Sequence, residues 1–112
     1  MSGPHDALLV FTNLPDHDAA VTFARELVDR RLAACVNVLG AATSVYRWKG
    51  VVETTTEVPV LIKTRAQLYA QVETAIRELH SYELPEILAV SIERGLPQYL
   101  EWVLAETSAA AS

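Results

Sequence analysis

The sequence predicts a single α+β domain with the ferredoxin-like order β-α-β-β-α-β, a long central hairpin and a C-terminal helix. Three observations predict it. Apolar runs alternate with helical stripes in that order, a tight-turn dipeptide joins the two middle extended segments, and the chain has no repeats or linkers. The 112 residues, 51% of them hydrophobic, suit one domain over 1–112 with its core at about 7–106.

The first third of the chain predicts a strand followed by a helix. Residues 7–11 are apolar without interruption, which is typical of a strand buried on both faces. Asp16 or Asp18 can cap the helix that follows, because a carboxylate accepts hydrogen bonds from free backbone N–H groups. The apolar stripe of that helix consists of Val21, Ala24, Val28 and Leu32, with Phe23 and Leu27 beside it.

The middle third predicts a hairpin. From residue 34 the side-chain period becomes two, and extended character continues to residue 48. Lys49-Gly50 predicts a tight turn in which glycine supplies positive φ, and residues 51–64 run back. Pro59 cannot donate a ladder hydrogen bond, so we expect a bulge or an unpaired position beside it.

The last third predicts a helix, a polar loop, a strand and a short helix. The stripe of the second helix consists of Leu68, Val72, Ile76 and Leu79. Residues 86–92 form a nearly continuous apolar strand, and 99–104 form a short helix.

The length of the hairpin indicates an oligomer. Each arm spans about fourteen residues, whereas an ordinary strand has about five to six. The far end must therefore project beyond the helices and expose Val45, Tyr46 and Trp48 together with bare strand edges. A closed cyclic homo-oligomer removes both problems. The alternative is a hairpin that lies flat on its own domain.

Composition excludes several functional classes. Fourteen acidic residues against nine basic ones give a net charge of −5, and no basic stripe suited to nucleic acid is visible. A single cysteine excludes an internal disulfide framework. Residues 1–6 lack a signal-peptide pattern, and no apolar run approaches the ~18 residues of a membrane span. The sequence therefore predicts a cytoplasmic protein without a membrane or nucleic-acid partner.

Five segments carry the most distinctive residues, namely 31–37, 46–50, 62–64, 80–87 and 99–102. In this order and spacing, from about residue 8 to residue 102, the chain resembles the CutA divalent-cation tolerance proteins. The resemblance implies a homotrimer with PII-like architecture whose hairpins pair between subunits. It also implies a role in the tolerance of copper and other divalent cations. The chain has Ser81 where members commonly have proline, and Leu79 and Phe11 where some have histidine and cysteine.

Metal binding is the first functional hypothesis. Cu(I) prefers thiolate ligands, and Cu(II) accepts imidazole and oxygen ligands. His80 with Glu83 or Glu86 is the candidate metal set, and Cys35 is a candidate thiolate ligand. The alternatives are that His80 orders its loop and that Cys35 is a small buried hydrophobe. The remaining copper-ligand types are His5, His17 and Met1. The expected cofactor is copper or another divalent cation, weakly bound, with no organic cofactor.

The second hypothesis is a PII-like sensor that binds a small molecule or a protein partner in a cleft between subunits. The candidate cleft residues are Asn37, Tyr46, Trp48, Lys63, Tyr82 and Trp102. Lys63, on an inner strand, either pairs with Glu86 or holds a small anion together with Tyr82 and Trp48. The alternatives are that both tryptophans are packing anchors and that Asn37 makes a buried hydrogen bond.

An enzyme is the third hypothesis and the least supported. Lys63, His80, Tyr82 and Glu86 are groups that general acid-base chemistry uses. No nucleophile–base pairing is legible, however, and four glycines form no phosphate-binding loop. The sequence therefore predicts a protein that is not an enzyme.

Overall fold

The computed structural model describes residues 6–108 and contains one antiparallel sheet. Its strands are β1 (Ala7–Leu14), β2 (Cys35–Val38), β3 (Ala42–Trp48), β4 (Val51–Arg65) and β5 (Leu88–Ser91). Its helices are α1 (His17–Asp29), α2 (Tyr69–Leu79) and α3 (Pro97–Glu106), with a short 3-10 turn at Ala66–Leu68 before α2. The strand order β2-β4-β1-β5, with β3 also pairing β4, confirms the predicted ferredoxin-like α+β fold.

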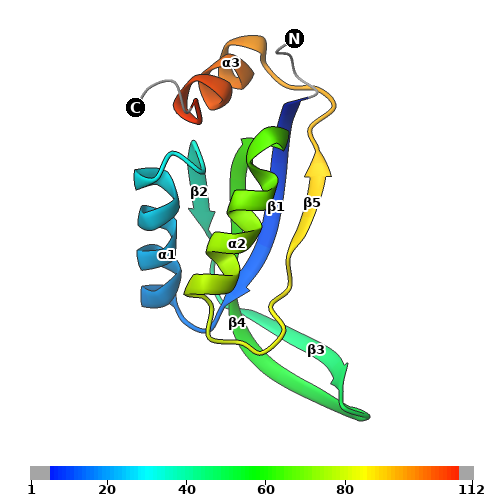
Figure 1. Cartoon of the computed structure of the whole chain (residues 1–112). Helices are drawn as coiled ribbons and strands as arrows, with labels where there is room; N and C mark the ends of the chain where they lie inside the picture. The colour runs from blue at the N-terminus through cyan, green and yellow to red at the C-terminus, as the bar shows by residue number, and fades with distance from the viewer. Residues whose placement is uncertain (1–5, 109–112) are drawn as a thin grey trace.

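Helices α1 and α2 cover one face of the sheet, and α3 lies across its end (Figure 1). The core lies between the helices and the sheet, where alternate strand residues such as Val10, Val60 and Ile62 are fully buried. The side chains between them point to the opposite face. We call this second face the open face; its apolar residues are Leu9, Phe11, Leu61, Leu88 and Val90.

The predicted buried stripe of α1 is displaced by one position. Asp16 does cap the helix, because its Oδ1 accepts a 2.8 Å hydrogen bond from the N–H of Ala19. The buried residues, however, are Ala20, Phe23 and Leu27, while Val28 is 44% exposed. Both sets obey helical spacing, so the periodicity alone did not separate them. The larger side chains of Phe23 and Leu27 fill the space above the sheet.

The hairpin contains the bulge that Pro59 predicts. Strand β2 ends with Val38 opposite Val60, and β3 begins with Ala42 opposite Glu57. Residues 39–41 therefore face only two residues of β4. The carbonyl of Pro59 accepts a 3.0 Å hydrogen bond from Leu39 N, so the proline nitrogen, on the same side, faces this interruption.

The tip of the hairpin also agrees with its prediction. Lys49 (φ 51°) and Gly50 (φ 83°) both have positive φ, as a two-residue type I′ turn requires. The hairpin projects beyond the helices (Figure 1), and the side chains of Val45, Val51 and Val52 are 57–66% exposed. It does not lie flat on its own domain.

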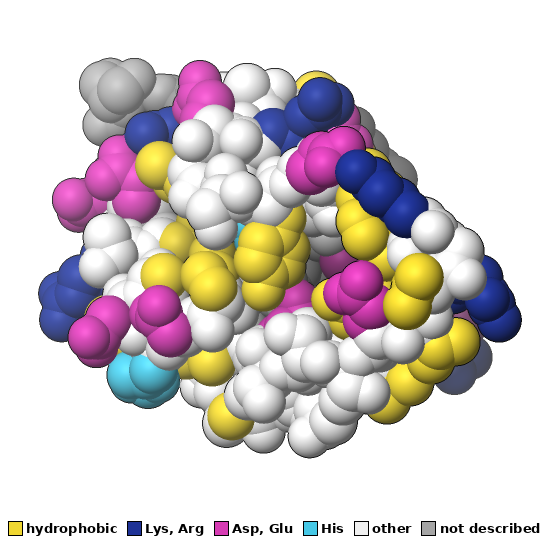
Figure 2. All heavy atoms as spheres, turned by 90° about the horizontal axis from the view of Figure 1, so that it is seen from below, with side chains coloured by type: hydrophobic (Ala, Val, Ile, Leu, Met, Phe, Trp, Pro, Cys, Tyr) yellow, Lys and Arg dark blue, Asp and Glu magenta, His cyan; other side chains and the backbone are white. Residues whose placement is uncertain are grey.

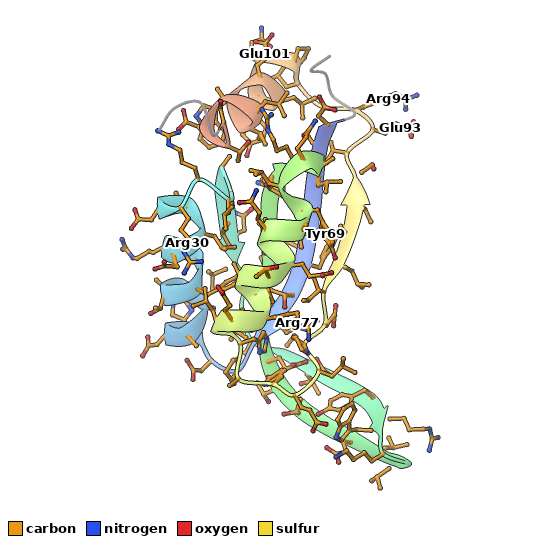
Figure 3. The ribbon with its side chains drawn as sticks, in the orientation of Figure 1. Arg30, Tyr69, Arg77, Glu93, Arg94 and Glu101 are labelled. Atoms are coloured by element: carbon orange, nitrogen blue, oxygen red, sulfur yellow. The ribbon has the colours of Figure 1, made fainter. Side chains whose placement is uncertain are left out.

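The other element boundaries differ slightly from the predicted ones. Strand β5 is shorter than 86–92, because Glu86 belongs to the loop, and α3 begins two residues early at Pro97, a residue suited to a first helical turn. Leu79 of the predicted α2 stripe is 41% exposed. Charged side chains such as Arg30, Glu93 and Glu101 lie at the periphery (Figure 3). No described helix is long and apolar enough to cross a membrane.

Candidate functional site

His80 attaches the loop after α2 to strand β1. Its Nε2 is hydrogen-bonded to the carbonyl oxygen of Asn13, and its Nδ1 accepts a 3.2 Å hydrogen bond from the N–H of Tyr82. A carbonyl only accepts, so Nε2 carries the proton and the imidazole is in one defined tautomer. The ring centroids of His80 and Tyr82 lie 4.3 Å apart. Both ring nitrogens are thus engaged, and His80 orders the loop.

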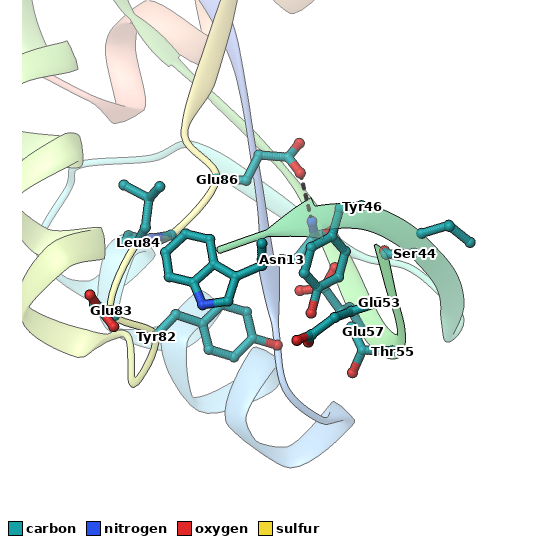
Figure 4. A pocket seen from close by; sticks show the side chains of 13 residues that line it. Asn13, Ser44, Tyr46, Glu53, Thr55, Glu57, Tyr82, Glu83, Leu84 and Glu86 are labelled. Atoms are coloured by element: carbon teal, nitrogen blue, oxygen red, sulfur yellow. Dashed lines mark hydrogen bonds between the residues drawn. The ribbon is translucent and has the colours of Figure 1, made fainter. Parts of the chain in front are cut away.

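The ordered loop faces the hairpin across a pocket of about 870 Å³ (Figure 4). One wall is formed mainly by one face of the hairpin, where Tyr46 pairs with Glu53 and Ser44 pairs with Thr55, with Val45 at its edge. Trp48 lies on this same face, because strand side chains alternate. The other wall is the loop segment 82–86. We call this space the hairpin pocket.

The hairpin pocket is acidic. Four carboxylates line it: Glu53 and Glu57 from β4, and Glu83 and Glu86 from the loop. None of the described lining residues is Lys, Arg or His. Glu57 is only 8% exposed. Viewed from below, acidic and hydrophobic side chains lie side by side around this hollow (Figure 2).

Hydrogen bonds hold two of these groups in place. Glu86 Oε1 accepts a 2.9 Å hydrogen bond from Asn13 Nδ2, which fixes the loop to β1 a second time. The Tyr82 hydroxyl points toward Glu53 and Glu57 (Figure 4). Burial, followed by a hydrogen bond to Glu57 and the charge of that carboxylate, raises the pKa of Tyr82 to about 12. Tyr82 is therefore a neutral donor at physiological pH.

A cation from the chain itself lies at the rim of the hairpin pocket. Lys49 Nζ is 3.8 Å from Glu83 Oε1 and 5.6 Å from the centroid of the Trp48 ring. Both charged side chains are largely exposed, at 70% and 72%, so this ion pair is weak and readily displaced.

Lys63 lies outside the hairpin pocket. Its Nζ lies 5.6 Å from the ring centroid of Tyr99, and that centroid lies 5.5 Å from the ring centroid of Trp102, with the two rings tilted by 38°. The predicted Lys63–Glu86 ion pair is wrong, because Glu86 is held by Asn13 at the other end of the sheet. The structure therefore does not combine Lys63 with Tyr82 and Trp48 as an anion site within one chain, and Trp102 lies near Tyr99 on α3.

Asn37 and Cys35 are also apart from the pocket. Asn37 is exposed, so the expected buried hydrogen bond is wrong. Cys35 is half-buried and pairs with Lys63 across strands β2 and β4. That pair lies four residues along the sheet from the level of Asn13 and Pro59, or about 13 Å at strand rise. Cys35 and His80 therefore do not share a site within one chain.

The residues of one chain do not fit a metal centre. Within residues 6–108 no group of three His, Cys, Asp or Glu side chains is placed to hold a metal ion. Glu83 and Glu86 share the pocket, but the nitrogens of His80 bind Asn13 and Tyr82 instead. Of the other candidate ligands, His17 begins α1, and His5 and Met1 lie outside the described residues.

Sequence reasoning missed Glu53 and Glu57, the two carboxylates on the hairpin wall. A signal was present, because Glu53, Thr55 and Glu57 follow the two-residue period of a strand. Counting back from the Lys49-Gly50 turn places Glu53 opposite Tyr46, which the structure confirms. The unforeseen part is the approach of the loop, which converts this face into a pocket.

These features define a ferredoxin-like domain with a projecting hairpin, an open sheet face and an acidic, aromatic pocket. Residues 8–106 match the family model described as CutA1 divalent ion tolerance protein. Because this match covers most of the chain, the protein belongs to the CutA1 family. None of the family names describes an enzyme.

Relatives from distant organisms agree. The chain is 44% identical over 93 residues to Protein CutA homolog of Xenopus laevis, covering 83% of this chain and 62% of that protein. It is 38% identical over 99 residues to the Divalent-cation tolerance protein CutA of Thermus thermophilus, covering 88% and 96%. The chain spans little more than half of the mouse Protein CutA, 56% of its length.

Solved structures share the fold. CutA from Xylella fastidiosa superposes with a TM-score of 0.89 at 46% identity, covering 92% of this chain and 99% of that one. CutA from Archaeoglobus fulgidus, described as a periplasmic divalent cation tolerance protein, gives 0.88 at 33% identity, covering 91% and 99%. The cytoplasmic location expected from the sequence stays a prediction.

Proposed function

We propose that this chain acts as a homotrimer in the response to divalent cations. We further propose that it binds copper or another divalent cation weakly, through ligands from more than one subunit. The names of its relatives, divalent-cation tolerance proteins, support the response to cations. The observation that carries the assembly is the open face of the sheet.

The open face of the sheet carries exposed apolar side chains, which supports an assembly that covers them. Leu88 and Val90 are 58% and 50% exposed, and they adjoin Leu9, Phe11 and Leu61. Contiguous exposed apolar surface of this kind is typical of an interface. The projecting hairpin adds unpaired strand edges, which neighbouring subunits can cover. A closed ring of subunits covers the apolar face and the strand edges of every copy in the same way.

A metal site shared between subunits is proposed because the described residues of one chain contain no group of three metal-ligating side chains. Glu83 and Glu86 are exposed on the loop beside the hairpin, and carboxylate oxygens are ligands for hard divalent cations and for Cu(II). A ring of three subunits brings further copies of these carboxylates near one another. Ligands on exposed side chains remain accessible to water, which favours weak binding.

Native mass spectrometry tests both parts. The purified protein is titrated with Cu(II) and Zn(II), and with Cu(I) under anaerobic conditions. We expect a trimer with a fixed number of ions per subunit, reduced in Glu83→Gln and Glu86→Gln and unchanged in Glu101→Gln, an exposed glutamate on α3. Scattered adducts on an intact trimer would contradict direct metal binding. A monomer would contradict the assembly.

A PII-like sensor is the second candidate, and the hairpin pocket favours it. Its volume of about 870 Å³ suits a small-molecule ligand. A ligand between the loop and the hairpin would restrain the hairpin, which is the element available to neighbouring subunits and partners. A thermal-stability screen tests this candidate, since a ligand that binds the folded state raises the melting temperature. A screen without any shift would contradict it.

A further inference from the structure

We propose that the hairpin pocket binds an organic cation carrying two or more amino groups, of the linear polyamine class. This inference rests on the small-molecule candidate above. It shares Glu83 and Glu86 with the proposed metal ligands, so a divalent cation bound there would compete with the ligand. It also replaces the small anion expected from Lys63, because Lys63 lies elsewhere. Four features of the pocket support the proposal, namely its charge, its buried carboxylate Glu57, its aromatic rings and the position of Lys49.

The distribution of carboxylates points to a ligand with more than one positive centre. Glu53 and Glu57 lie on the hairpin wall, and Glu83 and Glu86 lie on the loop wall. A ligand with one ammonium group leaves most of the negative charge of these four carboxylates without a positive partner. A linear polyamine can place its amino groups against both walls, and each ammonium offers several hydrogen-bond donors to carboxylate oxygens.

Glu57 gives the second, independent indication. Only 8% of its surface is exposed, and a buried carboxylate is costly without a positive partner. Its hydrogen bond from Tyr82 supplies a donor but no charge. No ion pair among residues 6–108 includes Glu57. A bound ammonium group would supply that charge.

The aromatic side chains distinguish an organic cation from a bare metal ion. Tyr46, Trp48 and Tyr82 line the same space as the carboxylates. Ring faces attract ammonium groups and also pack against methylene chains, which a polyamine carries between its charges. A hydrated metal ion gains little from such rings, and a phosphate is repelled by the carboxylates.

Lys49 shows that an ammonium group fits at this rim. Its Nζ lies near the Trp48 ring and the Glu83 carboxylate, which are the two kinds of contact proposed for the ligand. The lysine therefore competes with a ligand for the outer part of the pocket. Its removal should strengthen binding, whereas the loss of a pocket carboxylate should weaken it.

Isothermal titration calorimetry of the full chain with spermidine at low salt tests the proposal. We expect saturable binding that weakens about tenfold in Glu57→Gln, which removes one charged hydrogen-bonding partner. Glu53→Gln, at an exposed position, should weaken it as well and guards against a folding defect at buried Glu57. Lys49→Asn should tighten binding about threefold, and Asn-Gly preserves the turn. The matched control Glu101→Gln should leave binding unchanged.

Two further compounds, butylamine and inorganic phosphate, test which chemical class of ligand the pocket binds. Butylamine, with one amino group, should bind more weakly than spermidine, and inorganic phosphate should not bind. Equal affinity of the native chain, Glu53→Gln and Glu57→Gln for spermidine would overturn the proposal. A trimer stabilised by an anion and not by spermidine would overturn it and leave the sensor candidate standing. A trimer that binds no small molecule would contradict both.

Discussion

Arg65 Nη2 donates a 2.7 Å hydrogen bond to the carbonyl oxygen of Leu104, which ties the end of β4 to the last turn of α3. The same guanidinium donates through Nε to Thr107 Oγ1 at 3.1 Å. The N-terminus of α3 has no capping side chain, because Leu96 occupies the cap. The attachment of α3 therefore depends on Arg65 and on the apolar side of the helix, with a weaker contribution from exposed Arg31, which contacts Glu106.

Arg65→Ala should lower the free energy of unfolding by about 2 kcal/mol, because two hydrogen bonds from a charged donor are lost. Urea denaturation measures the change. Arg25→Ala, at an exposed position on α1, is the matched control and should stay within about 0.5 kcal/mol of the native chain. Equal effects of the two substitutions would show that Arg65 does not anchor α3.

Replacing threonine by valine should have opposite effects on stability at two buried positions, Thr64 and Thr12. Thr64 Oγ1 donates a 2.7 Å hydrogen bond to the carbonyl of Leu32, whereas Thr12 Oγ1 is buried without a hydrogen-bond partner among the described residues. Thr64→Val should destabilise by about 1–3 kcal/mol because the carbonyl loses its donor. Thr12→Val should be neutral or stabilising by about 1 kcal/mol. Thermal unfolding of both variants checks the pair, and a loss of stability in Thr12→Val would contradict the assignment.

The parts of the fold that could be predicted are those set by local chemistry. The Asp16 cap, the Lys49-Gly50 turn and the bulge opposite Pro59 each follow from what one or two residues can do with their own backbone. The resemblance then fixed the family. The face of α1 was mispredicted because two stripes, one through Val28 and one through Leu27, fit the same period, and only tertiary packing selects between them.

The candidate site could be predicted less well, because it is made by distant segments. His80, Tyr82 and the hairpin aromatics were identified, but the partner of each depends on how the loop returns across β1 to the edge of the sheet. The bond from His80 to Asn13 spans 67 residues, and that from Asn13 to Glu86 spans 73. Lys63 and Glu86 are compatible by charge, yet the register places Lys63 opposite Cys35 and Leu9, away from the loop.

Substitution by alanine should destabilise the hairpin at Gly50 but not at Gly40. Gly50 has φ 83°, a left-handed conformation that costs a residue with a side chain about 1–2 kcal/mol, while Gly40 has no positive φ and open space around the position that a Cβ would occupy. Gly50→Ala should therefore open the outer hairpin about fivefold more often, at a cost of about 1 kcal/mol. Hydrogen exchange of the amides of β3 measures this. Gly40→Ala is the control, and a larger effect there would contradict the turn assignment.

Ionisation of Tyr82 should lower the stability of the folded protein in alkaline solution. Its pKa in the folded protein is raised from the ordinary value of 10.0 to about 12, first by burial and then by Glu57, so folding favours the neutral phenol. The associated stabilisation is complete below the unfolded pKa and disappears as the pH rises from 10.0 towards about 12. Denaturant titrations across this window should show a steeper decline for the native chain than for Tyr82→Phe. Tyr99→Phe, near the other end of the sheet, controls for removing a hydroxyl group.

The same titration separates the two causes of the raised pKa. Glu57→Gln removes the carboxylate charge and leaves the ring in its place, so the pKa of Tyr82 should move part of the way back towards 10.0. Phenolate absorbance of the native chain and of this variant, each compared with its Tyr82→Phe counterpart, isolates the signal of Tyr82. An unchanged pKa would mean that burial, with the smaller effect of Tyr46, holds the phenol neutral without Glu57, and it would remove Glu57 as the charge that Tyr82 faces.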